Sequence, residues 1–236
     1  MAIDVMAAAD FYGTAQGIVT TGILRDRLAG FWPDLSGQSL LGVGYTAPYL
    51  RHWRDQTART ISLNPAQSGS FGRPVGRPCL SCITEDDQFP FADLSFDRII
   101  MVHGLEQADN ARRMLREVWR VLKDDGRLLV VVPNRSSAWA YLESTPFGHG
   151  QPYSSGQLGR LLSKTLFRVE RRDSALYMPP SSWRPILRSA SVWERVGRSI
   201  MPNLAGLAIA EATKDMEAPI PLHSTARRRV VLVQAG

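Results

Sequence analysis

The segment LLGVGYTAPYL, Leu40–Leu50, has the spacing that best suits a nucleotide-binding turn in this chain. Gly42 and Gly44 close an apolar run. Thr46 can cap a following helix, and Pro48 fits the first helical turn, where its missing N–H costs little. Many α/β proteins hold a nucleotide where a strand runs through a tight turn into a helix. The segment therefore predicts strand–turn–helix, in a version that is poor in glycine.

Histidine and tyrosine side chains are the candidates for proton transfer. His103 follows an apolar strand, and His149 lies in PFGHGQPYS, where glycines flank it. The phenols of Tyr12 and Tyr153 are further candidates. We take His103 and His149 as the candidate catalytic residues, with an ordinary loop position as the alternative for His149.

The cysteines, Cys79 and Cys82, predict no metal site. Residues three apart on a strand point to opposite faces, which suits neither a shared metal ion nor a disulfide. No second pair and no histidine cluster completes a zinc site. Both cysteines are expected to be small buried side chains.

Apolar runs and helical periodicities alternate along the chain. Continuous apolar strands alternating with helices predict an α/β fold with a parallel sheet covered on both faces. The long segment 64–78 between two strands has no apolar period. The elements expected are helices at 14–28, 46–54, 110–123 and 154–164, strands at 39–44, 59–63, 79–83, 96–105, 127–134, 167–177 and 206–213, a basic amphipathic stretch at 183–200 and an edge strand in the tail RRRVVLVQ.

The composition is that of a globular protein with a basic surface. Hydrophobic residues make up 44% and the net charge is +6, with arginines scattered over several segments. A solvated basic surface explains that pattern better than nucleic-acid binding. The start of the chain, MAIDVMAAADFYG, does not resemble a signal peptide, and the apolar runs are too short to span a bilayer. We therefore expect a cytoplasmic protein without a membrane association.

The segment 85–134 carries a family pattern in EDDQFPFADLSFDRIIMVHGLEQADNARRMLREVWRVLKDDGRLLVVVPN. An acidic residue before a PF pair, an SFD strand, an LREVWRVLK helix and an LLVVVPN strand resemble class I S-adenosylmethionine-dependent methyltransferases of the small-molecule, type 11-like kind. This resemblance implies a doubly wound, mostly parallel sheet of seven strands. It also implies a cofactor over the carboxyl ends of the first two strands.

The cofactor-binding turn departs from the family's pattern. Gly44 matches its first glycine, whereas Gly42 stands where the family has an acid. Thr46 and Pro48 stand where it has further glycines. A side chain forced into a left-handed backbone costs about 1–2 kcal/mol, so we expect a weakened, degenerate motif.

Other cofactor contacts follow from the same resemblance. Asn64 replaces the acid that accepts both ribose hydroxyls, and it offers only one carbonyl oxygen. Glu85 matches the acid that meets the adenine amino group. His103 lies where the family lines its pocket. Tyr12 and Tyr45 are candidates that compensate for the altered turn, beside Gly42 and Gly44 themselves.

The resemblance implies transfer of a methyl group from S-adenosylmethionine to a small molecule. The alternative is a binding or regulatory protein on the same fold, with the basic segment Trp183–Ile200 as the surface for a protein partner. Nucleic acid is a less favoured partner, because VVPN is not the polar-aromatic motif of base-methylating enzymes. We expect one domain, with a helical cap (1–35), a nucleotide-binding core (36–134), a substrate side (135–213) and a tail (214–236).

Overall fold

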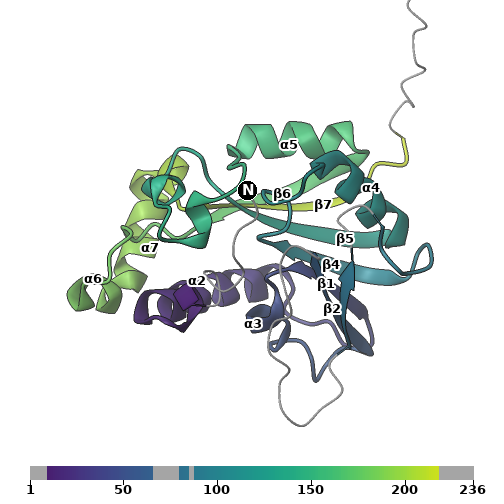
Figure 1. Cartoon of the computed structure of the whole chain (residues 1–236), viewed down its shortest axis with the longest axis horizontal. Coiled ribbons are helices and arrows are strands. Elements are labelled where there is room, and N and C mark those ends of the chain that lie inside the picture. Colours follow the sequence, from purple (N-terminus) through teal and green to yellow (C-terminus); the bar gives the residue numbers. More distant parts are fainter. Residues whose placement is uncertain (1–9, 66–79, 85–87, 218–236) are drawn as a thin grey trace, which may run out of the picture.

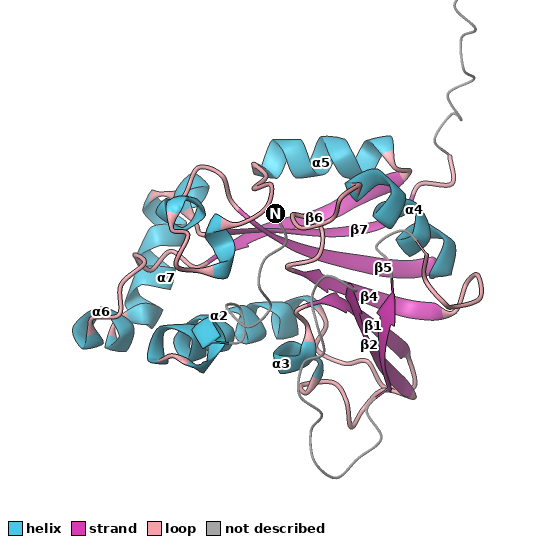
Figure 2. Ribbon diagram, in the orientation of Figure 1, coloured by secondary structure: helices cyan, strands magenta, loops and turns pink. Residues whose placement is uncertain are grey.

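The computed structural model describes residues 10–65, 80–84 and 88–217, which form one seven-stranded sheet with helices on both faces (Figures 1 and 2). The strand order is β3-β2-β1-β4-β5-β7-β6, and only β7 runs antiparallel to its neighbours. The predicted doubly wound, mostly parallel sheet is confirmed. The strands are β1 (Ser39–Gly44), β2 (Arg59–Pro65), β3 (Leu80–Thr84), β4 (Phe96–Val102), β5 (Leu122–Pro133), β6 (Phe167–Ala175) and β7 (Leu207–Lys214).

The direction of winding reverses between β1 and β4. The chain moves outward from β1 to β3 and then returns to pair β4 with the other side of β1, with Gly44 opposite Val102. In open α/β sheets ligands bind outside the carboxyl ends of the strands at such a switch point. The fold therefore places the turn after Gly44 and the residues after Val102 at the usual binding edge.

Alternating residues of the strands supply two separate cores. Leu40 and Val102 pack on one face, whereas Leu41 and Met101 pack on the other, as the period of two requires. The first core is covered by α2 (Ala15–Phe31), α3 (Ala47–Leu50) and residues of α6 (Arg184–Arg188) and α7 (Ala190–Ile200). The second is covered by α4 (Ala111–Val121) and α5 (Ser155–Lys164).

Two helix boundaries differ from the sequence prediction. α2 continues to Phe31, because Leu28 and Phe31 are both buried in the first core. α4 ends at Val121, and β5 already begins at Leu122, which is fully buried opposite Phe96. Gly126 does not have a positive φ; it is small because an added Cβ would lie 2.6 Å from the Leu122 side chain.

Most of the other predicted elements lie close to their expected positions, whereas the helix expected at 46–54 covers only Ala47–Leu50. The basic stretch forms two helices, α6 and α7, instead of one; Pro185 lies in the first turn of α6, and Ser189 separates the two helices. Cys79, Glu85 and the tail lie outside the described residues, and so does the side chain of Cys82. Within the described ranges, no helix combines the length and the apolar character needed to cross a membrane.

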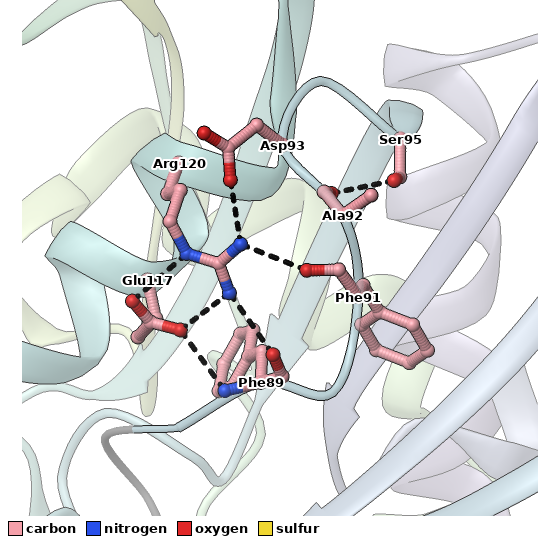
Figure 3. A network of polar contacts seen from close by, with 7 residues as sticks. All are labelled: Phe89, Phe91, Ala92, Asp93, Ser95, Glu117 and Arg120. Carbon is pink, nitrogen blue, oxygen red and sulfur yellow. Dashed lines mark hydrogen bonds and ion pairs between the residues drawn. The ribbon is translucent and has the colours of Figure 1, made fainter.

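Arg120 of α4 fixes the turn that follows Glu85 (Figure 3). Its guanidinium donates to the carbonyl oxygens of Phe89 (2.9 Å) and Phe91 (2.8 Å) and to the Asp93 carboxylate (2.7 Å). Glu117 accepts from Arg120 at 2.7 Å and from the Phe89 N–H at 3.0 Å. The glutamate and arginine of the LREVWRVLK pattern therefore hold the PF turn against the sheet.

Replacing Arg120 by alanine is expected to lower the free energy of unfolding by about 2 kcal/mol, since two carbonyls and two carboxylates lose a charged donor. Arg120→Lys keeps the charge but loses the fork, so it should recover less than half of that loss. Urea unfolding of the three proteins measures this. Equal stability of the lysine variant and the wild type would contradict the geometric role of the guanidinium.

The stabilisation by the ion pair between Glu117 and Arg120 depends on pH. Hydrogen bonding by Arg120 lowers the pKa of the Glu117 carboxyl below its ordinary value. The stabilisation is therefore fully present above that ordinary value and is lost as the pH falls through the lower folded value. The stability difference between wild type and Glu117→Gln should shrink between neutral pH and about pH 3. A difference that stays constant over this range would exclude the ion pair.

Candidate functional site

The turn after β1 is held tightly against the end of β4. Gly44 has φ +82°, and an added Cβ would collide with the carbonyl oxygen of Val102 and lie 2.9 Å from the nitrogen of Gly104. The Tyr45 N–H donates to the same Val102 oxygen at 2.7 Å. Glycine is therefore required at position 44 by its backbone angle and by this close approach.

Thr46 fills the space above Gly42. A Cβ at Gly42 would collide with the Thr46 hydroxyl and lie 2.7 Å from Cδ1 of Leu50. Thr46 is completely buried, with φ −106° and ψ −13°, so its backbone is not left-handed. The strain that the family pattern predicted at Thr46 is therefore absent.

The helix after this turn is shorter than predicted. α3 covers only Ala47–Leu50, and turns follow it. Pro48 lies in its first turn as expected, but the Thr46 hydroxyl does not cap it; that oxygen lies 3.5 Å from the Gly44 carbonyl oxygen instead. Since Thr46 is directed toward Gly42, its side chain is not available to the helix N–H groups.

Asn64 lies where the resemblance placed it. It is buried near the carboxyl end of β2, in register with Ile83 of β3. Glu85, the third predicted contact, lies outside the described residues. A role of Asn64 in binding the ribose of the cofactor stays a prediction.

A buried chain of three polar side chains lies at the switch point. The Tyr12 hydroxyl is 2.7 Å from Nε2 of His103, and Nδ1 of His103 is 2.7 Å from Oε1 of Glu106. His103 has φ +53°, a left-handed conformation that is costly for a residue with a side chain and is often found at functional sites. The sequence prediction included Tyr12 and His103 but missed Glu106.

When Glu106 is ionised, the donors and acceptors along Tyr12, His103 and Glu106 can be assigned consistently. The carboxylate accepts from Nδ1–H of His103, so Nε2 carries the lone pair and accepts from the Tyr12 hydroxyl. Burial raises the pKa of the Tyr12 phenol well above its ordinary value, and neighbouring Tyr49 adds to this. Tyr12 is therefore a hydrogen donor at neutral pH.

Only one of the two carboxylate oxygens of Glu106 has a hydrogen-bond partner among the described residues. Its side chain is fully buried, and Oε2 has no hydrogen-bond partner among the described residues. An unpaired carboxylate oxygen in the interior is costly, and such a group needs a donor or a cation. The backbone oxygen of Glu106 also accepts from the Gln151 N–H at 2.8 Å, which fixes the loop after His149 beside it.

Aromatic rings enclose the polar chain. Tyr12 stacks on Tyr45 with ring centres 4.4 Å apart, and the Phe147 ring lies 5.1 Å from that of His103. Phe11 contacts Tyr12, Phe147 and Trp139 edge to face. Trp139 is a core residue and donates to the Met178 carbonyl oxygen. These rings exclude water from the imidazole.

His149 and Tyr153 lie in the loop region beside this site. Nε2 of His149 is 2.7 Å from the carbonyl oxygen of Glu143, so it must be the protonated nitrogen. This bond is local to the loop, and a catalytic role for His149 stays a prediction. Burial, together with the Glu106 carboxylate, raises the pKa of the Tyr153 phenol.

A separate cavity of about 500 Å³ lies between α2, β6 and α7. Arg27 in its wall pairs with Asp173 and Glu194, so much of its charge is already balanced. In the strand order β4, β5 and β7 separate β6 from β1, a lateral distance of about 19 Å at about 4.8 Å per strand. This cavity is therefore distinct from the switch-point site.

Comparison with known proteins identifies the core of the chain. Residues 40–130 match the family model described as a methyltransferase domain. This range holds the turn at Gly44, the end of β2 and the His103–Glu106 pair. The core is similar to a methyltransferase domain. The resemblance inferred from the motifs is confirmed.

Solved methyltransferases share the fold of this domain at low sequence identity. A methyltransferase from Thermotoga maritima, described as a possible histamine N-methyltransferase, is 16% identical, with a TM-score of 0.58 over 87% of this chain and 93% of that one. A methyltransferase from Aquifex aeolicus is 13% identical, with a TM-score of 0.57 over 90% and 99%. The [4+2]-cyclase SpnF is 20% identical, with a TM-score of 0.53 over 81% and 80%. The methyltransferase fold therefore also occurs in a protein described as a cyclase.

Curated relatives add no activity. Uncharacterized proteins of Mycobacterium tuberculosis and Mycobacterium bovis are 30% identical over 108 residues, which is 43% of this chain and 38% of theirs. The match therefore spans well under half the length of these relatives.

Proposed function

We propose that this methyltransferase domain transfers a methyl group from S-adenosylmethionine to a small-molecule acceptor. The observation that carries the proposal is the buried carboxylate of Glu106, whose Oε2 lacks a partner among the described residues beside the switch point. A cationic group of a ligand would satisfy it. S-adenosylmethionine carries an ammonium group. This chain lacks the acid that the family pattern has for that end of the cofactor, because position 42 is a glycine.

The residues present fit this cofactor in an altered form. Asn64 would accept from one ribose hydroxyl, and Gly44 and Tyr45 would form the floor beneath it. Glu106 would take over from the missing acid at Gly42 and hold the ammonium end. When bound, the cofactor supplies an electrophilic methyl group to the acceptor.

The polar chain can remove the proton of an acceptor hydroxyl. The acceptor would give its proton to the Tyr12 oxygen while the Tyr12 proton moves to Nε2 of His103, and Glu106 would stabilise the resulting imidazolium. The surrounding aromatic rings would keep water from the reacting atoms. We further infer the division into a core at 36–134 and a substrate side at 135–213.

A binding or regulatory role on the same fold is the second candidate. It is favoured by the Thr46 side chain, which occupies the volume above Gly42, and by Pro48, which offers no N–H. It is less well supported, because the turn accommodates both residues without a left-handed backbone.

Calorimetric titration with S-adenosylmethionine and S-adenosylhomocysteine tests the proposal. We expect micromolar dissociation constants for the wild type. Asn64→Asp should bind about tenfold more tightly, because the carboxylate accepts from both ribose hydroxyls, and Asn64→Leu about tenfold more weakly. Asn203→Asp, the same change at an exposed position, is the control. Absence of binding at millimolar ligand to the wild type and to Asn64→Asp would reject the proposal.

A further inference from the structure

The connection between β6 and β7 forms an outlying pair of helices. α6 and α7 lie at the end of the molecule that is opposite β2 (Figure 1). Leu187 of α6 and Ala190 of α7 anchor the pair in the first core. The pair therefore has an inner side packed on the protein and an outer side open to solvent.

The outer side of α7 carries an apolar stripe, which consists of Val192, Trp193, Val196 and Ile200. Val192, Val196 and Ile200 are each four residues apart, and Trp193 is three before Val196, so they share one helical face. All are exposed, Ile200 to 67%. Trp183, just before α6, is exposed to 66%. Nothing in the described part of the chain covers these side chains.

The charged side chains that α6 and α7 expose to solvent are positive. Arg184 and Arg188 of α6 and Arg195 of α7 are exposed. The acid of the pair, Glu194, is turned inward, with 12% of its side chain exposed.

Glu194 is committed to contacts within the protein. It accepts from the N–H groups of Tyr177 (2.6 Å) and Leu176 (3.3 Å) and lies 3.4 Å from Arg27. Its negative charge is therefore not offered to a partner. The exposed surface of α6 and α7 combines cations with the apolar stripe.

We propose that α6 and α7 dock this protein on an anionic lipid surface. Surface helices that lie in the membrane interface combine exposed Trp and aliphatic side chains with arginines, and anionic headgroups attract those arginines. The sequence pattern alone favoured a protein partner here. The exposed indole at Trp183 and the apolar stripe favour lipid, because such side chains insert at the membrane interface. The inward position of Glu194 leaves the arginines to attract anionic headgroups.

Co-sedimentation with lipid vesicles tests the docking. The purified full chain is mixed at low salt with vesicles of phosphatidylcholine, or of phosphatidylcholine with about 30% phosphatidylglycerol. We expect binding to the anionic vesicles alone, falling as salt is raised. Arg188→Gln and Arg195→Gln should each weaken partitioning by about fivefold.

Variants of the apolar stripe distinguish docking through α7 from unspecific attraction of a basic protein to anionic vesicles. Val196→Asp with Ile200→Asp should abolish vesicle binding while the melting temperature stays unchanged, since both positions are exposed. Ile18→Asp, at an equally exposed apolar site on α2, should bind as the wild type does. Equal vesicle binding by the stripe variant, or no binding by the wild type, would overturn the proposal. Light scattering that shows dimers of the wild type and monomers of the stripe variant would overturn it in favour of self-association.

Discussion

Gly42→Asp is expected to destabilise the fold by about 3 kcal/mol or more, although it restores the residue type that the family has at this position. A side chain at position 42 would meet the Thr46 hydroxyl and the Leu50 side chain, and overpacking of a buried site costs about 1–3 kcal/mol. Burying an additional carboxylate without a donor adds to this cost.

The same substitution should be tolerated better when Thr46 is also changed. Thr46→Gly removes the side chain that fills the space, at a cost of about 1–2 kcal/mol for the lost packing. In a double-mutant cycle we expect a favourable coupling of about 2 kcal/mol between the two positions, measured by urea unfolding. Additive effects would mean that Thr46 does not occupy the position of the missing acid.

Glu106→Gln is the second change with a large expected effect, and it acts on binding more than on folding. Glutamine has nearly the same shape and still accepts from Nδ1–H of His103, but it has no charge to offer a cationic ligand. We expect the affinity for S-adenosylhomocysteine to fall by about thirtyfold, which corresponds to about 2 kcal/mol. Glu143→Gln, an exposed acid in the neighbouring loop, should leave it unchanged.

The middle of the sheet could be predicted from the sequence because β1, β4 and the second half of β5 are largely buried on both faces. Runs such as FDRIIMV and LLVVVP permit few other structures, and the positions of β4 and of the second half of β5 followed from them. The boundary between α4 and β5 could not be predicted, because burial of Leu122 outweighs the turn preference of the following DDG.

The candidate site was predictable only in outline. Tyr12 and His103 were chosen separately, and the structure brings them together although 91 positions separate them. Glu106 was missed, although its spacing of three from His103 was a usable signal for a contact across one turn. The role of Thr46 depends on a volume above Gly42, and a sequence pattern does not contain such a volume.

Glu106 is proposed to replace the missing acid of the cofactor site. The most direct measurement is titration of wild type and Glu106→Gln with S-adenosylhomocysteine and with 5′-methylthioadenosine, which lacks the amino-acid end. We expect the wild type to bind S-adenosylhomocysteine about thirtyfold more tightly than 5′-methylthioadenosine. In Glu106→Gln this preference should vanish while the affinity for 5′-methylthioadenosine stays the same. An undiminished preference in Glu106→Gln would mean that Glu106 does not hold the ammonium group.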